Sequence, residues 1–286
     1  MDRVVLKSPA KINLFLEVLK KREDGYHEIL SLMQAVDLCD EMVLEKRKSG
    51  IRVSSDHPDC PADEGNLAYQ AASLLLREGK INQGVSIHIS KRIPISAGLG
   101  GGSSNAATTL KGLNELFRLK LPDRRLHHLA SRLGSDVPFF LCSGQALAKG
   151  RGDEIEAKTL YRGYLLVLVY PGFGVSTKWV YQKAKISLTR ERKAVNYKAL
   201  GSSAGFFEAL PHFQNDLEEV VIRKHSVVQQ IKDILKNSGA VKSSMSGSGP
   251  TVYGVFDQKP QAEDVAKKLS RGDWQVYLTQ PIPGNI

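Results

Sequence analysis

The sequence predicts a protein of mixed α and β structure (α+β) that is built as two lobes. Apolar and polar residues alternate as in strands through the first part of the chain, and a glycine-rich loop then separates a strand from a helix. A second series of predicted strands and helices begins near residue 161. We therefore place one lobe at residues 1–160 and another at residues 161–286, because a chain of this length has enough apolar material for two joined lobes.

The first part of the chain is predicted to form an antiparallel sheet. Residues 3–7 and 10–20 mix β-branched and alternating apolar side chains, and the polar turn at residues 22–25 follows them. Residues 41–47 and 51–55 alternate again, on either side of a Lys-Ser-Gly sequence that is typical of a hairpin turn. We expect these segments to be strands of one sheet.

A helix and a strand are predicted before the glycine-rich loop, and a second helix after it. Residues 66–78 carry apolar side chains at helical spacing, with Asn66 as the N-cap and Gly79 as the stop. Residues 85–89 alternate as in a half-buried strand. After the loop, residues 104–117 are rich in Ala and Leu, which favour a helix.

The second lobe is predicted to be an α/β sandwich. Residues 164–170 form a continuous apolar run that is typical of a buried strand. The other predicted elements are helices at residues 178–185, 216–224, 227–236 and 261–269 and strands at residues 251–256 and 275–279. Residues 183–197 are polar and basic, and we expect them to be a mobile surface segment.

The formal net charge of +10 does not by itself identify a partner. Three explanations are open: a solvated surface, small anionic substrates that a positive field attracts, and nucleic acid. The Lys and Arg residues are scattered along the chain and form no single basic block. We therefore expect no nucleic-acid partner.

Neither a membrane span nor a disulfide framework is expected. No stretch approaches the roughly 20 apolar residues that cross a bilayer, and residues 1–11 lack the apolar core of a secretory signal. Cys39, Cys60 and Cys142 are odd in number and lack the spacing of a zinc site. We expect a cytoplasmic protein with free thiols, no metal site built from protein residues and no membrane partner.

The glycine-rich segment, residues 94–107, has the composition of a phosphate-binding loop. Its four glycines let the backbone approach an anion, and the N-terminus of the following helix adds about half a positive charge. A Walker A loop would need a lysine after Gly102, and a Rossmann loop would need a glycine at Ser103. A flexible linker fits poorly, because a strand and a strong helix flank the segment directly. The residues expected to contact a nucleotide are Pro94, Ile95, Ser96, Ala97, Gly98, Leu99, Gly100, Gly101, Gly102, Ser103 and Ser104.

This segment resembles the nucleotide loop of the GHMP kinases, which are named for galactokinase, homoserine kinase, mevalonate kinase and phosphomevalonate kinase. Residues 98–107 are most similar to the version in the kinase of the non-mevalonate isoprenoid pathway, with Ser96 where Gly or Ala is more usual. Residues 9–14 with residues 24–27 resemble the substrate-binding opening of that kinase, and residues 134–140 its catalytic-acid segment. Near the C-terminus, the motif Met-Ser-Gly-Ser-Gly-Pro resembles the third GHMP motif.

The resemblance implies the two-lobed GHMP kinase fold. Residues 1–160 would then be the ATP-binding N-terminal domain, with a left-handed βαβ crossover, and residues 161–286 the C-terminal domain. It also implies transfer of the γ-phosphate of ATP to the 2-hydroxyl of 4-diphosphocytidyl-2-C-methyl-D-erythritol, with Mg²⁺ bridging the phosphates. We expect a monomer or a weak homodimer.

Two residues are expected to be catalytic. Phosphoryl transfer needs a group that accepts the proton of the attacking hydroxyl, and the resemblance assigns this to Asp136. By itself, an Asp before Val-Pro is more often a cap or turn residue. Lys11 lies in an otherwise apolar strand, where its ammonium is costly to bury unless it is paired. Asp136 would pair with it, although a surface lysine with a buried stem is the alternative.

The remaining expected contacts follow from the resemblance. Tyr26 and Tyr181 would stack on the cytosine base, although core packing is the alternative for Tyr181. His27 and Asn13 would bind the cytosine edge and the erythritol part. The other members of the expected set are Thr177 and Gly247 on the substrate side and Asn66 and Lys91 on the adenosine side.

Two other functions are open at this point. Another GHMP kinase, acting on homoserine, mevalonate or a sugar, would share the phosphate loop but would not depend on cytidine. A basic RNA-binding protein is the alternative from another class, because the N-terminal lobe of the family resembles a ribosomal-protein fold. It would show steep salt dependence without ATP turnover.

Overall fold

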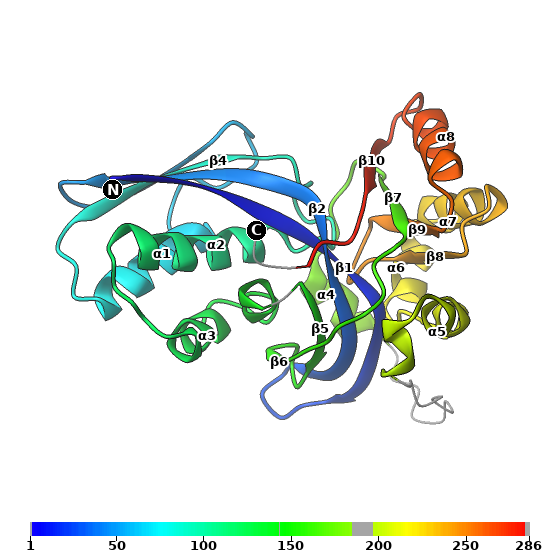
Figure 1. Ribbon diagram of the computed structural model, residues 1–286, viewed down its shortest axis with the longest axis horizontal. Coiled ribbons are helices and arrows are strands. Elements are labelled where there is room, and N and C mark those ends of the chain that lie inside the picture. Colours follow the sequence, from blue (N-terminus) through cyan, green and yellow to red (C-terminus); the bar gives the residue numbers. More distant parts are fainter. Residues whose placement is uncertain (1, 143, 185–196, 284–286) are drawn as a thin grey trace.

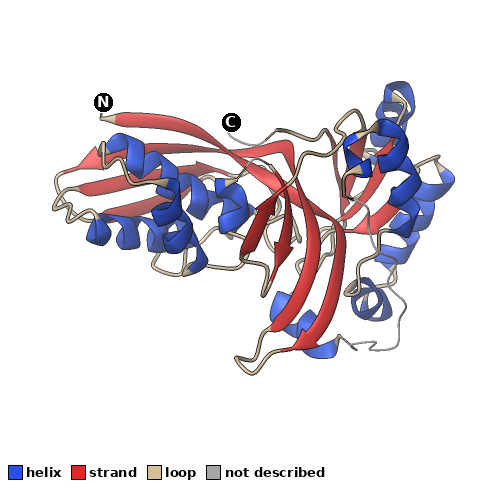
Figure 2. Cartoon of the chain, turned by 60° about the horizontal axis from the view of Figure 1, so that its bottom comes forward, coloured by secondary structure: helices blue, strands red, loops and turns tan. Residues whose placement is uncertain are grey.

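The computed structural model describes residues 2–142, 144–184 and 197–283, and it contains two sheets with helices packed against them (Figures 1 and 2). The first sheet is made of β1 (Arg3–Lys21), β2 (His27–Arg47), β3 (Ile51–Ser55), β4 (Gly84–Ser90), β5 (Gln145–Lys149) and β6 (Glu154–Ala157). Its order is β3-β4-β2-β5-β6, and β1 also pairs with β2. The helices α1 (Leu67–Glu78) and α2 (Gly101–Leu116) lie against this sheet, and α3 (Asp123–Ser131) packs on these two helices.

The second sheet has the order β10-β7-β9-β8 and is entirely antiparallel. Its strands are β7 (Leu165–Tyr170), β8 (Lys242–Met245), β9 (Val252–Phe256) and β10 (Gln275–Thr279). The helices of this lobe are α4 (Thr177–Lys183), α5 (Ser203–Ala209), α6 (Glu218–Lys224), α7 (Val227–Asn237) and α8 (Lys259–Leu269). Single 3-10 turns occur at Pro138–Leu141, Ala199–Gly201 and Leu210–His212.

The second sheet is buried on both faces, which explains the continuous apolar run in β7. One face packs on β1, where Leu166 and Leu168 share a core with Ile12 and Leu14. The opposite face, which includes Val167, packs under the helices of the second lobe. A strand that is buried on both faces has no polar side to alternate with. The predicted α/β sandwich is confirmed, and β1 forms part of the core between the lobes.

The first two predicted strands are in fact one strand. β1 pairs with β2 along its whole length, and its register shifts between Pro9 and Ala10, between Asn13 and Phe15, and between Val18 and Lys20. Each shift adds a bulge, which lets a long strand bend without ending. β2 is also longer than predicted, because its buried first half lacks the alternation that marks residues 41–47.

The predicted hairpin between residues 41–47 and 51–55 is wrong. β4 lies between β2 and β3, antiparallel to β2 and parallel to β3. The start of β4 lies directly against the turn before β3, where Val85 N donates to Gly50 O at 2.9 Å. This close approach requires glycine at residue 84, because a Cβ there would lie only 2.0 Å from the same oxygen. β3, α1 and β4 therefore form the βαβ unit of this lobe.

Most other predicted elements are confirmed within a few residues. Asn66 caps α1 by accepting from Ala68 N, and α2 begins at Gly101, inside the glycine-rich loop. The short elements α3, β5, β6, α5 and β8 were not predicted, because none carries a long periodic pattern. Residues 185–196, which form most of the predicted mobile segment, lie outside the described residues.

The division after residue 160 stays a prediction. It falls between β6, the last strand of the first sheet, and β7, the first strand of the second. The end of the chain nevertheless returns to the first lobe, since Ile282 N donates to Ala35 O at 3.0 Å and the Ile282 side chain joins the first core.

Among the helices of the described residues, none combines the length and hydropathy needed to cross a membrane. Cys39, Cys60 and Cys142 are free thiols, as predicted. Within residues 2–142, 144–184 and 197–283, His, Cys, Asp and Glu side chains form no cluster able to hold a metal ion by themselves.

Candidate active site

A cavity of about 1050 Å³ opens between the glycine-rich loop, the start of α4 and the turn between β1 and β2. It is lined by residues from both lobes, and nearly all of the predicted site residues are among them. Those residues are Lys11, Asn13, Tyr26, His27, Asn66, Lys91, Pro94, Ile95, Ser96, Ala97, Gly98, Gly100, Gly101, Gly102, Ser103, Asp136, Thr177, Tyr181 and Gly247.

The glycine-rich loop needs glycine at two positions in particular. Gly98 has a φ of +79°, and a Cβ there would lie 2.2 Å from Ser246 O. Gly100 has a φ of +71° and is the N-cap of α2, so the loop runs directly into the helix N-terminus. This places backbone N–H groups and the positive end of α2 at the wall of the cavity.

Two predicted loop residues do not face the cavity with their side chains. Leu99 is fully buried in the core between the lobes, and its carbonyl accepts from Lys11 N at 2.9 Å. Ser104 is also fully buried, and its hydroxyl accepts from Ser8 Oγ at 2.8 Å. Any contact that these residues make with a nucleotide would come from their backbone.

The predicted ion pair between Lys11 and Asp136 is present at the cavity wall. Lys11 Nζ lies 3.4 Å from Asp136 Oδ2, and it donates to Asn13 Oδ1 at 2.6 Å and to Gly98 O at 3.2 Å. The Lys11 side chain is 4% exposed, whereas Asp136 is 33% exposed. The ammonium is therefore held by three oxygens, and the carboxylate opens to the cavity.

Lys91 is held by a carboxylate that the sequence analysis missed. Asp40 is fully buried, and its Oδ2 lies 2.5 Å from Lys91 Nζ and accepts from Asn105 Nδ2 at 3.0 Å. The other oxygen accepts from the backbone N–H groups of Arg92 and Ile93. An ionised carboxylate is buried only with such partners. No signal in the sequence marked this role, because Asp40 lies just before the predicted strand at residues 41–47.

The two residues predicted for the adenosine side are both engaged within the protein. Lys91 Nζ lies 3.1 Å from where a Cβ on Gly101 would be, which places its charge beside the phosphate loop. Asn66 Oδ1 accepts from Ala68 N, and its Nδ2 donates to Pro61 O at 2.6 Å. Their contacts with adenosine stay predictions.

Three aromatic rings, from Tyr26, His27 and Tyr181, line the same cavity and form what we call its aromatic end. The His27 and Tyr181 rings stack, with centroids 5.4 Å apart and an interplanar angle of 30°. Tyr26 is 51% exposed. Burial raises the pKa of Tyr181, and the negative charge of Asp136 raises it further, so the phenol stays neutral near the ion pair. One face of Tyr181 is covered by His27 before any base arrives.

The loop between β8 and β9, residues 246–251, closes the cavity beside Lys11, and we call it the Gly247 loop. Gly247 has a φ of +56°, and a Cβ there would lie 3.0 Å from Asn13 Oδ1 and 3.2 Å from Lys11 Nζ. Thr177 Oγ1 lies 2.8 Å from Ser248 Oγ, which joins the start of α4 to this loop. Only a residue without a side chain fits so close to the ion pair.

The Asn-Asp-Leu-Glu segment before and within α6 holds the Gly247 loop in place, and the sequence analysis missed this role. Asn215 is buried, and its Nδ2 donates to Met245 O and to Gly247 O, both at 2.8 Å. Asp216 accepts from Val18 N in the first lobe at 2.8 Å. An Asn and an Asp just before a helix gave only a capping signal, because their partners are distant in sequence.

We expect His27 to be neutral at neutral pH, and the pH dependence of acceptor binding should reflect this. Burial lowers the pKa of His27 below its usual 6.5, and the charge of Lys21 lowers it further. Because the folded protein binds this proton less tightly than the unfolded chain, the contribution of His27 to stability is complete above about pH 6.5 and is lost as the pH falls below it.

We expect the KM for the acceptor to stay constant from pH 8 to 6.5 and to rise only at lower pH, where His27 becomes protonated. Steady-state kinetics would check this, and a His27→Gln variant should lack the rise.

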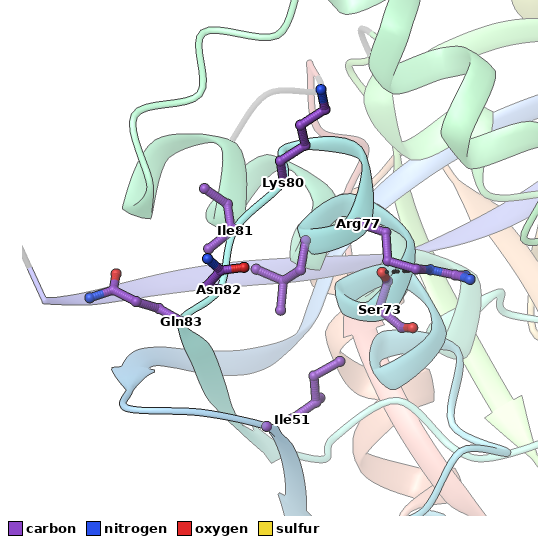
Figure 3. A pocket seen from close by; sticks show the side chains of 9 residues that line it. Ile51, Ser73, Arg77, Lys80, Ile81, Asn82 and Gln83 are labelled. Atoms are coloured by element: carbon purple, nitrogen blue, oxygen red, sulfur yellow. Dashed lines mark hydrogen bonds between the residues drawn. The ribbon is translucent and has the colours of Figure 1, made fainter.

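A smaller hollow of about 390 Å³ lies away from this cavity, at the C-terminal end of α1. Figure 3 shows that its two cationic side chains, Arg77 and Lys80, point in different directions. Arg77 Nε donates to Ser73 O at 3.3 Å. Their charges do not converge on a common point, so the hollow lacks the arrangement of a binding site.

Comparisons with known proteins agree with this geometry. Two family models match, "GHMP kinases N terminal domain" at residues 66–144 and "GHMP kinases C terminal" at residues 193–273. A 4-diphosphocytidyl-2-C-methyl-D-erythritol kinase of Acetivibrio thermocellus is 42% identical over 289 residues, which cover 99% of this chain and 100% of that protein.

Solved structures show the same relationship. A crystal structure of 4-(cytidine 5'-diphospho)-2C-methyl-D-erythritol kinase superposes with a TM-score of 0.80 at 33% identity, covering 98% of this chain and 100% of the other. Homoserine kinase from Cytophaga hutchinsonii superposes with a TM-score of 0.77 at 20% identity, covering 99% and 96%, which shows the fold alone. The chain belongs to the 4-diphosphocytidyl-2-C-methyl-D-erythritol kinase family of the GHMP kinases.

Proposed function

We infer that this chain transfers the γ-phosphate of ATP to the 2-hydroxyl of 4-diphosphocytidyl-2-C-methyl-D-erythritol, in the non-mevalonate route to isoprenoid precursors. The full-length similarity to kinases named for this substrate supports the inference. The observation that carries it is the Lys11–Asp136 pair, which lies in one cavity with the glycine-rich loop and with the His27–Tyr181 stack.

The acceptor hydroxyl would be activated at Asp136. Its carboxylate is partly exposed to the cavity, so a hydroxyl placed there can donate to it and transfer its proton as the new P–O bond forms. The buried ammonium of Lys11 stands beside the same point. It would offset the negative charge that develops in the transition state.

The phosphates of ATP would lie on the glycine-rich loop. The backbone N–H groups around Gly100 and Gly101 and the N-terminus of α2 face the cavity there. Lys91, which Asp40 holds beside Gly101, would add a fixed positive charge. This cradle binds the donor, whereas the aromatic end of the cavity would bind the cytidine group of the acceptor.

The residues present fit Mg²⁺ that arrives with the phosphates. Within the described residues there is no cluster of His, Cys, Asp and Glu to hold the ion alone, and Mg²⁺ in kinases is commonly held by one or two carboxylates together with substrate phosphates. Asp136 and the Ser103 hydroxyl line the cavity and would hold it, whereas Ser104 is buried and hydrogen-bonded. When bound, Mg²⁺ neutralises charge on the transferring phosphate.

Another GHMP kinase activity, on homoserine or mevalonate, has weaker support. The homoserine kinase structure is similar only at the level of the fold, and a small acyclic acceptor gives no role to three rings at one end of the cavity. We propose a small-molecule acceptor, cytoplasmic action without nucleic-acid or membrane partners, and a monomer or weak homodimer.

A substrate comparison tests the proposed function. We expect ADP release that depends on Mg²⁺ and on the cytidyl acceptor, with no turnover of mevalonate, homoserine or galactose. Turnover of one of those three compounds in place of the cytidyl acceptor would leave the kinase family intact and overturn the proposed substrate. Salt-sensitive RNA binding by a protein that turns over none of them would support the RNA-binding alternative.

A further inference from the structure

The tight turn between β5 and β6 brings an arginine to the aromatic end of the cavity. Gly150 and Gly152 have φ values of +64° and +104°, and Arg151 lies between them. A Cβ on Gly152 would lie 3.2 Å from Ile29 Cδ1 and 3.5 Å from Ser135 Cβ, so the turn packs against the segment that carries Asp136. Arg151 lines the cavity, and neither the comparisons nor the sequence motifs assign it a role.

The guanidinium of Arg151 is held in one orientation. Its Nε donates to Asp153 Oδ2 at 2.8 Å, and its Nη2 donates to Ser131 O at 2.6 Å. Its Cζ lies 5.3 Å from the centroid of the Tyr26 ring. An arginine side chain is flexible when it is free, and two hydrogen bonds in a fixed fork remove much of that freedom.

The Tyr26 ring lies beside the Arg151 guanidinium, on a backbone that is already fixed. The backbone of Tyr26 is fixed, because its carbonyl accepts from Arg22 N at 2.8 Å and its N–H donates to Asp24 Oδ1 at 3.0 Å. The ring itself is half exposed, and no other aromatic side chain of the described residues stacks on it. Among the aromatic and cationic side chains of that part of the chain, only Arg151 lies over the Tyr26 ring.

We propose that Arg151 is a positioning residue for the acceptor, which holds the Tyr26 ring ready to stack on the cytosine base. The cation lies 5.3 Å from the ring centroid, within the range at which a cation is attracted to an aromatic face. A ring that is oriented in advance loses less freedom when the base stacks on it, so the acceptor binds more tightly. The effect falls on acceptor binding, because Arg151 contacts Asp153, Ser131 and Tyr26, none of which belongs to the glycine-rich loop.

A double-mutant cycle with a binding probe tests this inference, which rests on the proposed function. The variants are Arg151→Met, Tyr26→Leu and the two combined. Arg151→Met keeps an unbranched side chain but removes the charged, planar guanidinium. Arg125→Met is the matched control, because Arg125 is also an ion-paired arginine but pairs with Glu78 outside the cavity. The measurements are the Kd for cytidine diphosphate by calorimetry, the KM values for the acceptor and for ATP, and the Tm.

We expect Arg151→Met to weaken cytidine diphosphate binding and to raise the acceptor KM by about 3- to 30-fold. The ATP KM should change less than about 2-fold. In the Tyr26→Leu background the same change should have almost no effect, because there is no ring left to orient. Arg151→Lys keeps a cation and should recover part of the loss, and Arg125→Met should bind like the unmodified protein.

The outcomes separate this inference from the proposed function. If the unmodified protein phosphorylates the cytidyl acceptor but the two substitutions are additive, Arg151 does not act through Tyr26 and the inference is overturned. Equal losses for the acceptor and ATP, with a lower Tm, would make Arg151 a structural residue only. If the protein binds cytidine diphosphate with the expected coupling but does not phosphorylate the acceptor, the proposed function fails and the inference stands. Failure to bind cytidine diphosphate would overturn the inference, whereas the proposed function would still be decided by turnover of the cytidyl acceptor.

Discussion

An Asp136→Asn variant should lose about 100- to 10,000-fold in kcat. An amide has nearly the same size as the carboxylate but cannot accept the proton of the acceptor hydroxyl at neutral pH. Lys11 Nζ, 3.4 Å from Asp136, would also lose its counter-charge, although Asn13 and Gly98 would still accept from it. Steady-state kinetics with the cytidyl acceptor would measure the loss.

Asp24→Asn is the matched control for this experiment, because Asp24 lines the same cavity but pairs with Arg22 instead of Lys11. Its effect should fall on the acceptor KM through the neighbouring Tyr26 and should stay below about 10-fold. A loss of kcat in Asp24→Asn equal to that in Asp136→Asn would mean that the loss is not specific to the carboxylate beside Lys11, which would contradict the role of Asp136 as the base. A nearly unchanged kcat in Asp136→Asn would contradict its role as the base and leave it to position the hydroxyl.

A Gly98→Ala variant should lose about 2 to 5 kcal/mol of stability together with most of its kinase activity. The φ of +79° is unfavourable for alanine, and the new Cβ would lie 2.2 Å from Ser246 O and 2.9 Å from Gly249 N. These are backbone atoms of the loop that carries Gly247, so no flexible side chain can move aside. The glycine-rich loop would have to move away from the Lys11–Asp136 pair, which would separate donor from acceptor.

Gly102→Ala is the control for stability, because Gly102 lies in the first turn of α2 and a Cβ there would meet only Leu67 Cδ1, at 3.8 Å. Alanine favours a helix more than glycine does, so the Tm of Gly102→Ala should be unchanged or slightly higher. For Gly98→Ala, thermal unfolding should show a Tm lower by more than about 5 °C. Equal Tm values for the two variants would contradict the clash at Gly98.

The features that the sequence predicted correctly depend on short segments. The glycine-rich loop was identifiable because its flanking strand and helix are local patterns, and because close backbone approach to an anion requires glycine. Lys11 stood out as a charge in an apolar strand, and its pairing with Asp136 is confirmed. The helices α1, α7 and α8 follow from periodicity and, in α1, from a capping residue.

The features that the sequence did not predict depend on contacts between distant segments. β2 and β3 look like a hairpin in the sequence, but β4 lies between them and pairs with both. Burial against α1 and α2, and not the turn after β2, determines this strand order. Asp40, Asn215 and Arg151 gave no distinctive local signal. Each acquires a role through partners elsewhere in the chain: Lys91, Gly247 and Tyr26 respectively.

The sequence by itself therefore determined the family, the glycine-rich loop and the Lys11–Asp136 ion pair. Local backbone conformation and the cost of burying a charge are both readable from a few neighbouring residues. The tertiary structure decided the order of the strands, the residues that hold the loops around the catalytic pair, and the contact between Arg151 and Tyr26. Hydrogen bonds and packing between residues up to 248 positions apart, as for Gln34 and Ile282, exist only once the chain has folded.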